Sequence, residues 1–167
     1  NRSSNVNKLC MLLTFSVSLW SLSILGRELS LEKTTAHFFV RLSYGGAIFI
    51  PPIFLHFVIS LLRQVRRNLI LFVYTLSFIF LILDFTPLFI RDVGPILSFR
   101  YYGIPGMIYP FFVITFISIA GYGHYILIKH LKQSGGQRRN QIKYLLFATI
   151  IGFLGGGTTF LPVFNIE

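Results

Sequence analysis

Five long apolar segments, separated by short hydrophilic ones, dominate the pattern of this sequence. They cover residues 9–25, 44–62, 69–90, 104–128 and 142–161. A helix needs about 20 mostly apolar residues to cross the hydrocarbon core of a bilayer, because each residue adds roughly 1.5 Å toward a thickness of roughly 30 Å. The third segment reaches that length only by continuing past Asp84. The pattern therefore predicts an all-α integral membrane fold, a bundle of five transmembrane helices.

The second apolar segment contains two consecutive prolines, Pro51 and Pro52. A proline has no N–H to donate and its ring clashes with the preceding helical turn. We therefore expect a kink at this point, with freed carbonyl groups that need partners from neighbouring helices or water. The kink has two interpretations: it acts as a hinge or helps to form a cavity, or it is a fixed feature of the helix shape.

The composition agrees with a chain whose solvent is lipid. Hydrophobic residues make up 54% of it, charged residues only 12%, and the mean hydropathy is +0.71. A soluble domain carries about 25% charged residues, so this chain could not cover its apolar surface in water. The same numbers exclude disorder, and a single cysteine, Cys10, excludes an internal disulfide scaffold.

The interpretation of the formal net charge of +10 depends on where the charges fall along the chain. If the connections alternate between the two sides of a membrane, one side carries ten cations and no acidic residue. These ten are Arg2, Lys8, Arg63, Arg66, Arg67, Lys129, Lys132, Arg138, Arg139 and Lys143. Cytoplasmic loops are rich in Lys and Arg, so the basic loops 63–68 and 129–143 are predicted to be cytoplasmic. The charge thus indicates an orientation and contact with the lipid bilayer, and no nucleic-acid partner is expected.

Sequence motifs of soluble enzymes are absent. There is no H-E-x-x-H zinc helix, no G-x-x-x-x-G-K-[ST] phosphate loop and no G-x-S-x-G nucleophile elbow. Histidines and carboxylates are scattered along the chain, which is not typical of a metal site. We therefore predict a non-catalytic chain that binds neither a cofactor nor a metal.

Two histidines lie inside apolar segments, where an ionisable group is costly and by default suggests a functional site. His56 follows the two prolines, and His124 lies toward the inner end of the fourth segment. Each is a candidate ligand or switch residue. The alternative is a neutral imidazole that hydrogen-bonds to a neighbouring helix and makes packing specific.

Further candidates lie where the third and fourth segments meet the outer side. Asp84 could contact an external cation or amine, or it could simply end its span and pair with Arg91 or Arg100. Tyr102 belongs to an aromatic stretch that would suit either an outward-facing ligand pocket or an ordinary aromatic belt at the membrane interface.

The last apolar segment is rich in glycine. Gly152 and Gly156 are four residues apart, a spacing that lets two helices approach closely, and Gly155 lies beside them. We expect these residues to serve helix packing within the chain, or dimerisation.

Several of these residues also carry a resemblance to a known family. Residues 51–57 read PPIFLHF, which resembles a P-P-x-x-x-H-F stretch in the N-terminal seven-transmembrane sensor region of bacterial histidine kinases. Residues 141–146 (QIKYLL), 151–156 (IGFLGG) and 159–162 (TFLP) are similar to the sixth span of that family, and the start of the chain through Trp20 is similar to its second span.

This resemblance implies a fold and a function. The chain would form spans two to six of seven, a single incomplete domain with one span missing at each end. It would be a sensory input domain in the bacterial inner membrane, in a histidine kinase or a related cyclase-type receptor. It would relay an unknown small-molecule or membrane signal to a C-terminal cytoplasmic effector module, and it would act as a homodimer. The alternative function is a small transporter or channel component, which would need a polar pathway.

Overall fold

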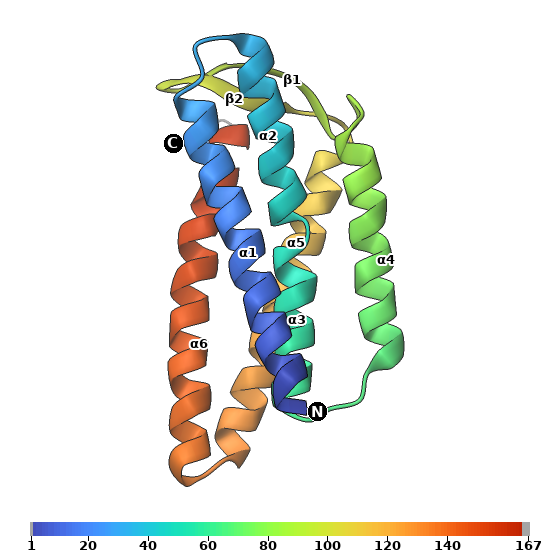
Figure 1. The fold of residues 1–167 in the computed structure, drawn as a ribbon, viewed down its shortest axis with the longest axis vertical. Coiled ribbons are helices and arrows are strands. Elements are labelled where there is room, and N and C mark those ends of the chain that lie inside the picture. Colours follow the sequence, from blue (N-terminus) through green and yellow to red (C-terminus); the bar gives the residue numbers. More distant parts are fainter. Residues whose placement is uncertain (1, 165–167) are drawn as a thin grey trace.

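The computed structural model describes residues 2–164 of the protein (Figure 1). In chain order its elements are α1 (Arg2–Glu28), α2 (Lys33–Ala47), α3 (Ile50–Leu61), α4 (Arg67–Asp84), β1 (Ile90–Ile96), β2 (Phe99–Pro105), α5 (Tyr109–Gln133), α6 (Gly136–Gly157), η1 (Thr158–Phe160) and η2 (Pro162–Phe164).

The helices stand side by side as an elongated bundle (Figure 1). Five helical stretches among the described residues are long and apolar enough to cross a membrane, and they are Ser4–Glu28, Lys33–Leu61, Arg67–Asp84, Tyr109–Gln133 and Gly136–Phe164. The five predicted helices are therefore confirmed. The two predicted basic stretches, 63–68 and 129–143, lie at the end of the bundle where the chain begins. The second is not a loop as expected, because only Ser134 and Gly135 connect α5 to α6, and its cations lie on the ends of those two helices.

A two-stranded antiparallel sheet crosses the opposite end of the bundle, so the all-α prediction was incomplete. Strands β1 and β2 pair with Val93 opposite Gly103. Helix α4, the third predicted span, does not continue to residue 90. Pro87 disfavours a helical conformation at the residue before it, and the chain turns after Asp84. The apolar residues Phe89, Ile90 and Val93 are fully buried against the helix ends, which explains why this segment resembles a span without being one.

Other boundaries also differ from those expected. Helices α1 and α6 begin at Arg2 and Gly136 and not at residues 9 and 142. The second helix begins at Lys33 and not at residue 44, because Ala36, Val40 and Ser43 form a buried face among polar neighbours. Helix α5, the fourth predicted span, begins at Tyr109 and not at residue 104, because residues 104 and 105 belong to β2.

The helix break that the prolines predict lies between α2 and α3. Helix α2 ends at Ala47, and Pro51 and Pro52 occupy the first turn of α3. Proline is well tolerated there, because the first N–H groups of a helix have no helical acceptor. Pro52 nevertheless leaves the Ile48 carbonyl without a helical donor, and the Ser77 hydroxyl on α4 lies 3.4 Å from that oxygen.

The core has two parts. Near the hairpin formed by β1 and β2, aromatic side chains pack edge to face, and the Tyr44 and Tyr109 hydroxyls form a buried hydrogen bond of 2.8 Å. Toward the basic stretches, aliphatic residues of α3 pack with α5, and Leu127 is fully buried there. Helices α1 and α2 approach closely at Gly46, where an added Cβ would lie 2.8 Å from the Ser16 carbonyl oxygen.

Helix α6 is much less enclosed than its neighbours. Eight of the twelve residues of α3 are buried, whereas Ile142 alone is buried among the 22 residues of α6. Within the described residues, α6 packs mainly on α5 and on η1. Among the described spans, α6 therefore contributes the fewest buried residues to the bundle.

Candidate functional site

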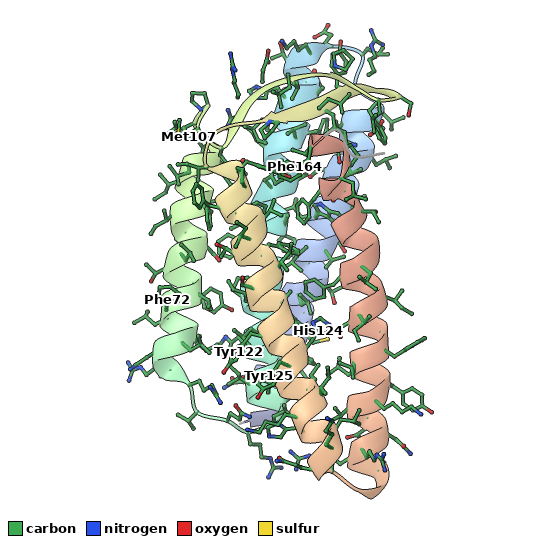
Figure 2. All side chains as sticks on the ribbon, turned by 180° about the vertical axis from the view of Figure 1, so that it is seen from behind. Phe72, Met107, Tyr122, His124, Tyr125 and Phe164 are labelled. Carbon is green, nitrogen blue, oxygen red and sulfur yellow. The ribbon has the colours of Figure 1, made fainter. Side chains whose placement is uncertain are left out.

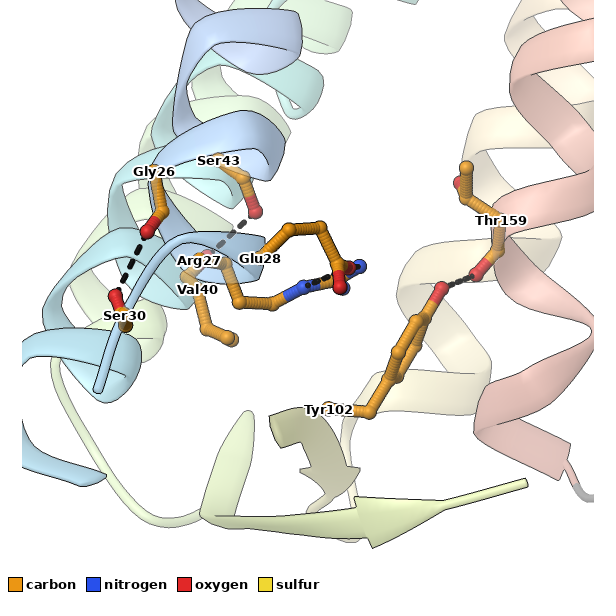
Figure 3. Close-up of polar contacts among 8 residues, drawn as sticks. All are labelled: Gly26, Arg27, Glu28, Ser30, Val40, Ser43, Tyr102 and Thr159. Atoms are coloured by element: carbon orange, nitrogen blue, oxygen red, sulfur yellow. Dashed lines mark hydrogen bonds and ion pairs between the residues drawn. The ribbon is translucent and has the colours of Figure 1, made fainter. Parts of the chain in front are cut away.

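Polar contacts at the hairpin end join three parts of the chain (Figure 3). The Arg27 guanidinium at the end of α1 pairs with the Glu28 carboxylate and lies 4.2 Å from the centroid of the Tyr102 ring on β2. The Tyr102 hydroxyl donates a hydrogen bond to the Thr159 carbonyl just beyond α6. The hairpin therefore contacts both the end of α1 and the short segment that follows α6.

The Tyr102 side chain is only 4% exposed. Burial raises the pKa of its phenol above the ordinary value of 10.0, and the nearby Arg27 charge opposes that increase. The phenol is consequently neutral at physiological pH and remains a hydrogen-bond donor to Thr159.

A second link ties the hairpin to α2. The Lys33 ammonium lies 2.7 Å from the Asp92 carboxylate, and both side chains are about half exposed. The hydrogen bond from Lys33, with a smaller contribution from the Val93 N–H, holds the pKa of Asp92 below its ordinary 3.8. Exposed pairs of this kind contribute little stability, so this one is a contact between β1 and the start of α2 and not a main support of the hairpin.

Asp84 ends α4 as expected, but it does not pair with Arg91 or Arg100. It is only 2% exposed, and its Oδ1 has no hydrogen-bond partner among the described residues. Arg91 lies on the exposed face of β1, and the Arg100 guanidinium lies 5.3 Å from the Tyr101 ring centroid, so neither cation turns inward. Of the alternatives for Asp84, the end of the span agrees with the structure and the pairing does not, because the hairpin directs both arginines away from the bundle.

Arg41 is the cation that lies near Asp84. Its guanidinium donates instead to the carbonyl oxygens of Thr86, at 3.5 Å, and Ile90, at 3.3 Å. Arg41 therefore stabilises the turn that leads from α4 into β1.

His56 lies on the face of α3 that meets α4. Its Nδ1 is 3.3 Å from the Tyr74 hydroxyl, and the two rings meet edge to face. This contact agrees with the interpretation of a neutral imidazole that joins two helices.

His124 lies on α5 beside α6 (Figure 2). Its Nδ1 is 2.8 Å from the Ala120 carbonyl oxygen, and since a carbonyl only accepts, Nδ1 carries the proton. The ring packs between Phe54 and Phe153, at centroid distances of 4.9 and 5.3 Å. Its Nε2 is buried without a partner among the described residues. His56 and His124 thus contact different helices and do not form one site.

A cavity of about 220 Å³ lies between α1, α5 and α6, next to the break between α2 and α3. Ile50 of the break lines it, as do Trp20 of α1 and Phe116 of α5. Gly152 and Gly156 form part of its wall on α6.

The expected packing role of the α6 glycines holds at one position only. An added Cβ at Gly156 would lie 3.4 Å from the Trp20 side chain, whereas at Gly152 and Gly155 it would meet no atom within 4 Å in the described part of the chain. At Gly152 the space belongs to the cavity, and Gly155 is directed elsewhere. Close helix approaches occur instead at Gly26, Gly46 and Gly123, where an added Cβ would lie 2.5 Å from the Phe39 ring, 2.8 Å from the Ser16 carbonyl oxygen and 2.7 Å from the Phe54 ring.

Three contacting residues were not singled out from the sequence. Arg27, Ser77 and Trp20 each act through a partner on a distant segment. Gly45-Gly46 inside an apolar segment was a usable sign of close helix packing, but no local pattern marks Arg27 or Ser77 as partners of Tyr102 and Ile48.

Comparison with known families agrees with this architecture. A model of the N-terminal 7TM region of histidine kinases matches residues 1–167, the whole chain. The chain belongs to this family. No curated protein and no solved structure matches it. This family is a sensory input region and not a catalytic domain, and with five apolar helices this histidine-kinase 7TM region is a multi-pass membrane protein.

Proposed function

We propose that this 7TM region senses a small-molecule or membrane signal and passes it to a C-terminal cytoplasmic effector in a bacterial histidine kinase or related cyclase-type receptor. The basic stretches 63–68 and 129–143 are cytoplasmic in this proposal, and the hairpin lies outside the bacterial inner membrane. Its support is the family match together with the concentration of Lys and Arg at one end of the bundle.

Helix α6 is the moving element in this proposal. It buries little surface against the rest of the bundle, and a cavity separates part of it from α1. A signal shifts α6 only if it binds one arrangement more tightly than the other. A signal that binds at the outer hairpin or in the cavity could favour one arrangement of α6, because the hairpin contacts the outer end of α6 and the cavity is lined by α6.

The hydrogen bond from Tyr102 to Thr159 is the observation that carries the mechanism. It connects the hairpin to the outer end of a helix whose inner end begins in the basic stretch 129–143. A displacement of the hairpin is thereby passed along α6 toward the cytoplasmic side.

Replacing Tyr102 with Phe tests this mechanism, because it removes the hydroxyl and keeps the ring beneath Arg27. The control is Tyr101→Phe, since the Tyr101 hydroxyl is exposed and makes only a 3.4 Å contact with the Leu31 carbonyl. Loss of a bond of about 1 kcal/mol changes an equilibrium constant about fivefold. In the full-length protein in nanodiscs, Y102F should change the basal rate of autophosphorylation by about that factor, and Y101F should not.

Two results would overturn the proposal. One is an unchanged rate in Y102F with the hydrogen bond demonstrably lost. The other is a full-length protein that carries no kinase or cyclase module.

A further inference from the structure

Asp84, at the end of α4, is the one acidic side chain that is buried among residues 2–164. Its Oδ1 receives no hydrogen bond from the described residues, and those residues already cover this oxygen. A further segment packed outside them would therefore not reach it. An ionised carboxylate is costly in such a place, and a group of this kind keeps its proton instead.

The nearby cation, Arg41 on α2, is engaged elsewhere. Its guanidinium donates to the Thr86 carbonyl at 3.5 Å and to the Ile90 carbonyl at 3.3 Å. Both distances are long for an N–H···O bond, so both bonds are weak. A charge-assisted bond to an ionised Asp84 would be shorter and stronger. Arg41 therefore has two alternative sets of acceptors, and the charge on Asp84 decides between them.

The other ionisable groups on the elements around Asp84 are bonded elsewhere, exposed or a turn away. They are His37 and Tyr44 of α2, Tyr109 of α5, Tyr102 of β2, and Arg91 and Asp92 of β1. The Tyr44 and Tyr109 hydroxyls bond to each other, Tyr102 bonds to the Thr159 carbonyl, Asp92 pairs with Lys33, and Arg91 is exposed. His37 lies one turn before Arg41 on the same helix. Within the described chain, Arg41 is thus the cation that an ionised Asp84 can recruit.

We propose that Asp84 is a proton-binding site that controls the turn between α4 and the hairpin. With the proton bound, Arg41 holds the Thr86 and Ile90 carbonyls. When Asp84 releases its proton to the solution at the hairpin end, its carboxylate draws Arg41 away, and the turn loses both bonds. Exposure of this end to the outer solution, and any effect on an effector, rest on the proposed function. The protonation itself does not.

Infrared difference spectra of the full-length protein in nanodiscs test the protonation. A protonated carboxyl has a C=O stretching band that a carboxylate lacks, so wild type minus Asp84→Asn isolates the Asp84 signal. This band should be present at neutral pH and should disappear as the pH approaches about 9, since buried carboxyls can hold their protons up to about that pH. The matched control is Asp92→Asn, which should remove no such band, because the half-exposed Asp92 has a pKa below 3.8.

Hydrogen exchange of the amides of residues 85–90 reports the Arg41 bonds. Their protection, corrected for the intrinsic effect of pH on exchange, should fall at least threefold between about pH 6 and about pH 9 in the wild type. It should stay constant in D84N, whose neutral amide keeps the proton-bound arrangement. Arg41→Gln is a second variant in case D84N fails to fold, and circular dichroism verifies folding. R41Q should show low protection at both pH values, and its carboxyl band should persist to higher pH, because the carboxylate has lost its cation.

A wild-type spectrum at neutral pH without a protonated-carboxyl band that depends on Asp84 would overturn the proposal, because the carboxylate would then be ionised throughout. So would a pH response of the turn that persists in D84N, since it would belong to another group such as His37. Titration of both the band and the turn beside an unchanged rate of autophosphorylation would retain the proton site and contradict only the proposed function.

Discussion

The Ser77 hydroxyl on α4 lies 3.4 Å from the carbonyl oxygen of Ile48, the group that Pro52 leaves without a helical donor. The same hydroxyl is 2.9 Å from the Val73 carbonyl of its own helix, so it is shared between two acceptors. A break in the second span is thus supported by a side chain from the third.

Replacing Ser77 with Ala should lower the free energy of unfolding by about 0.5–1 kcal/mol, because a buried carbonyl loses its donor and the bond is long. Ser118→Ala is the control, since the Ser118 hydroxyl is exposed and bonds only within α5. Thermal unfolding in detergent micelles checks both variants, and equal stability of S77A and S118A would show that the Ile48 carbonyl does not depend on Ser77.

The two partly buried histidines, His56 and His124, should respond differently to substitution by Phe. His56→Phe leaves the Tyr74 hydroxyl without its partner and should cost about 1 kcal/mol. His124→Phe removes a buried, partnerless Nε2 from between two phenylalanine rings, but it also removes the Nδ1 bond to the Ala120 carbonyl, so stability should change little.

Unfolding midpoints of the two variants check this expectation. A clear loss of stability in H124F would mean that its Nε2 has a partner in the membrane. In the full-length protein, effector output that is unchanged in H56F would assign His56 to packing alone.

The close approach of α1 and α2 predicts a sharp difference between adjacent glycines. Gly46→Ala would place a methyl group 2.8 Å from the Ser16 carbonyl oxygen. A methyl group added at Gly45 would have no atom within 4 Å. G46A should lose about 1–3 kcal/mol through overpacking, and G45A should gain up to about 1 kcal/mol through higher helix propensity. The measurement is again unfolding in micelles, and similar effects at both positions would contradict the close approach of the two helices at Gly46.

The ion pair between Lys33 and Asp92 predicts a pH dependence at the hairpin. A folded-state pKa below 3.8 means that the pair adds stability above that pH and loses it as the pH falls through the folded pKa. Carbon-detected NMR of labelled aspartate should give a pKa below 3.8 for Asp92, and Lys33→Met should raise it. An Asp92 pKa that is indifferent to Lys33→Met would mean that the pair does not form.

The spans and the concentration of basic residues on one side could be read from the sequence, because burial in lipid and charge bias act along the chain itself. The break at Pro51 could be predicted for the same reason, since proline acts on its own helix. The hairpin could not, because Ile90 and Val93 are as apolar as a span residue and only tertiary packing shows that they cover helix ends. Whether Asp84 pairs with Arg91 or Arg100 could not be decided from the sequence, because the direction of both arginines depends on that same hairpin.

The central claim is that α6 shifts against the rest of the bundle when the effector output changes. Pulsed electron resonance distances between spin labels test it most directly, in the full-length protein with native cysteines replaced, including the exposed Cys10. One label pair joins Met11 on α1 to Leu154 on α6, and the reference pair joins Met11 to Phe38 on α2; all three positions are exposed. Between the wild type and Tyr102→Phe, the distance from α1 to α6 should change while the distance from α1 to α2 stays fixed. An unchanged distance from α1 to α6, in proteins whose autophosphorylation rates differ, would contradict the account.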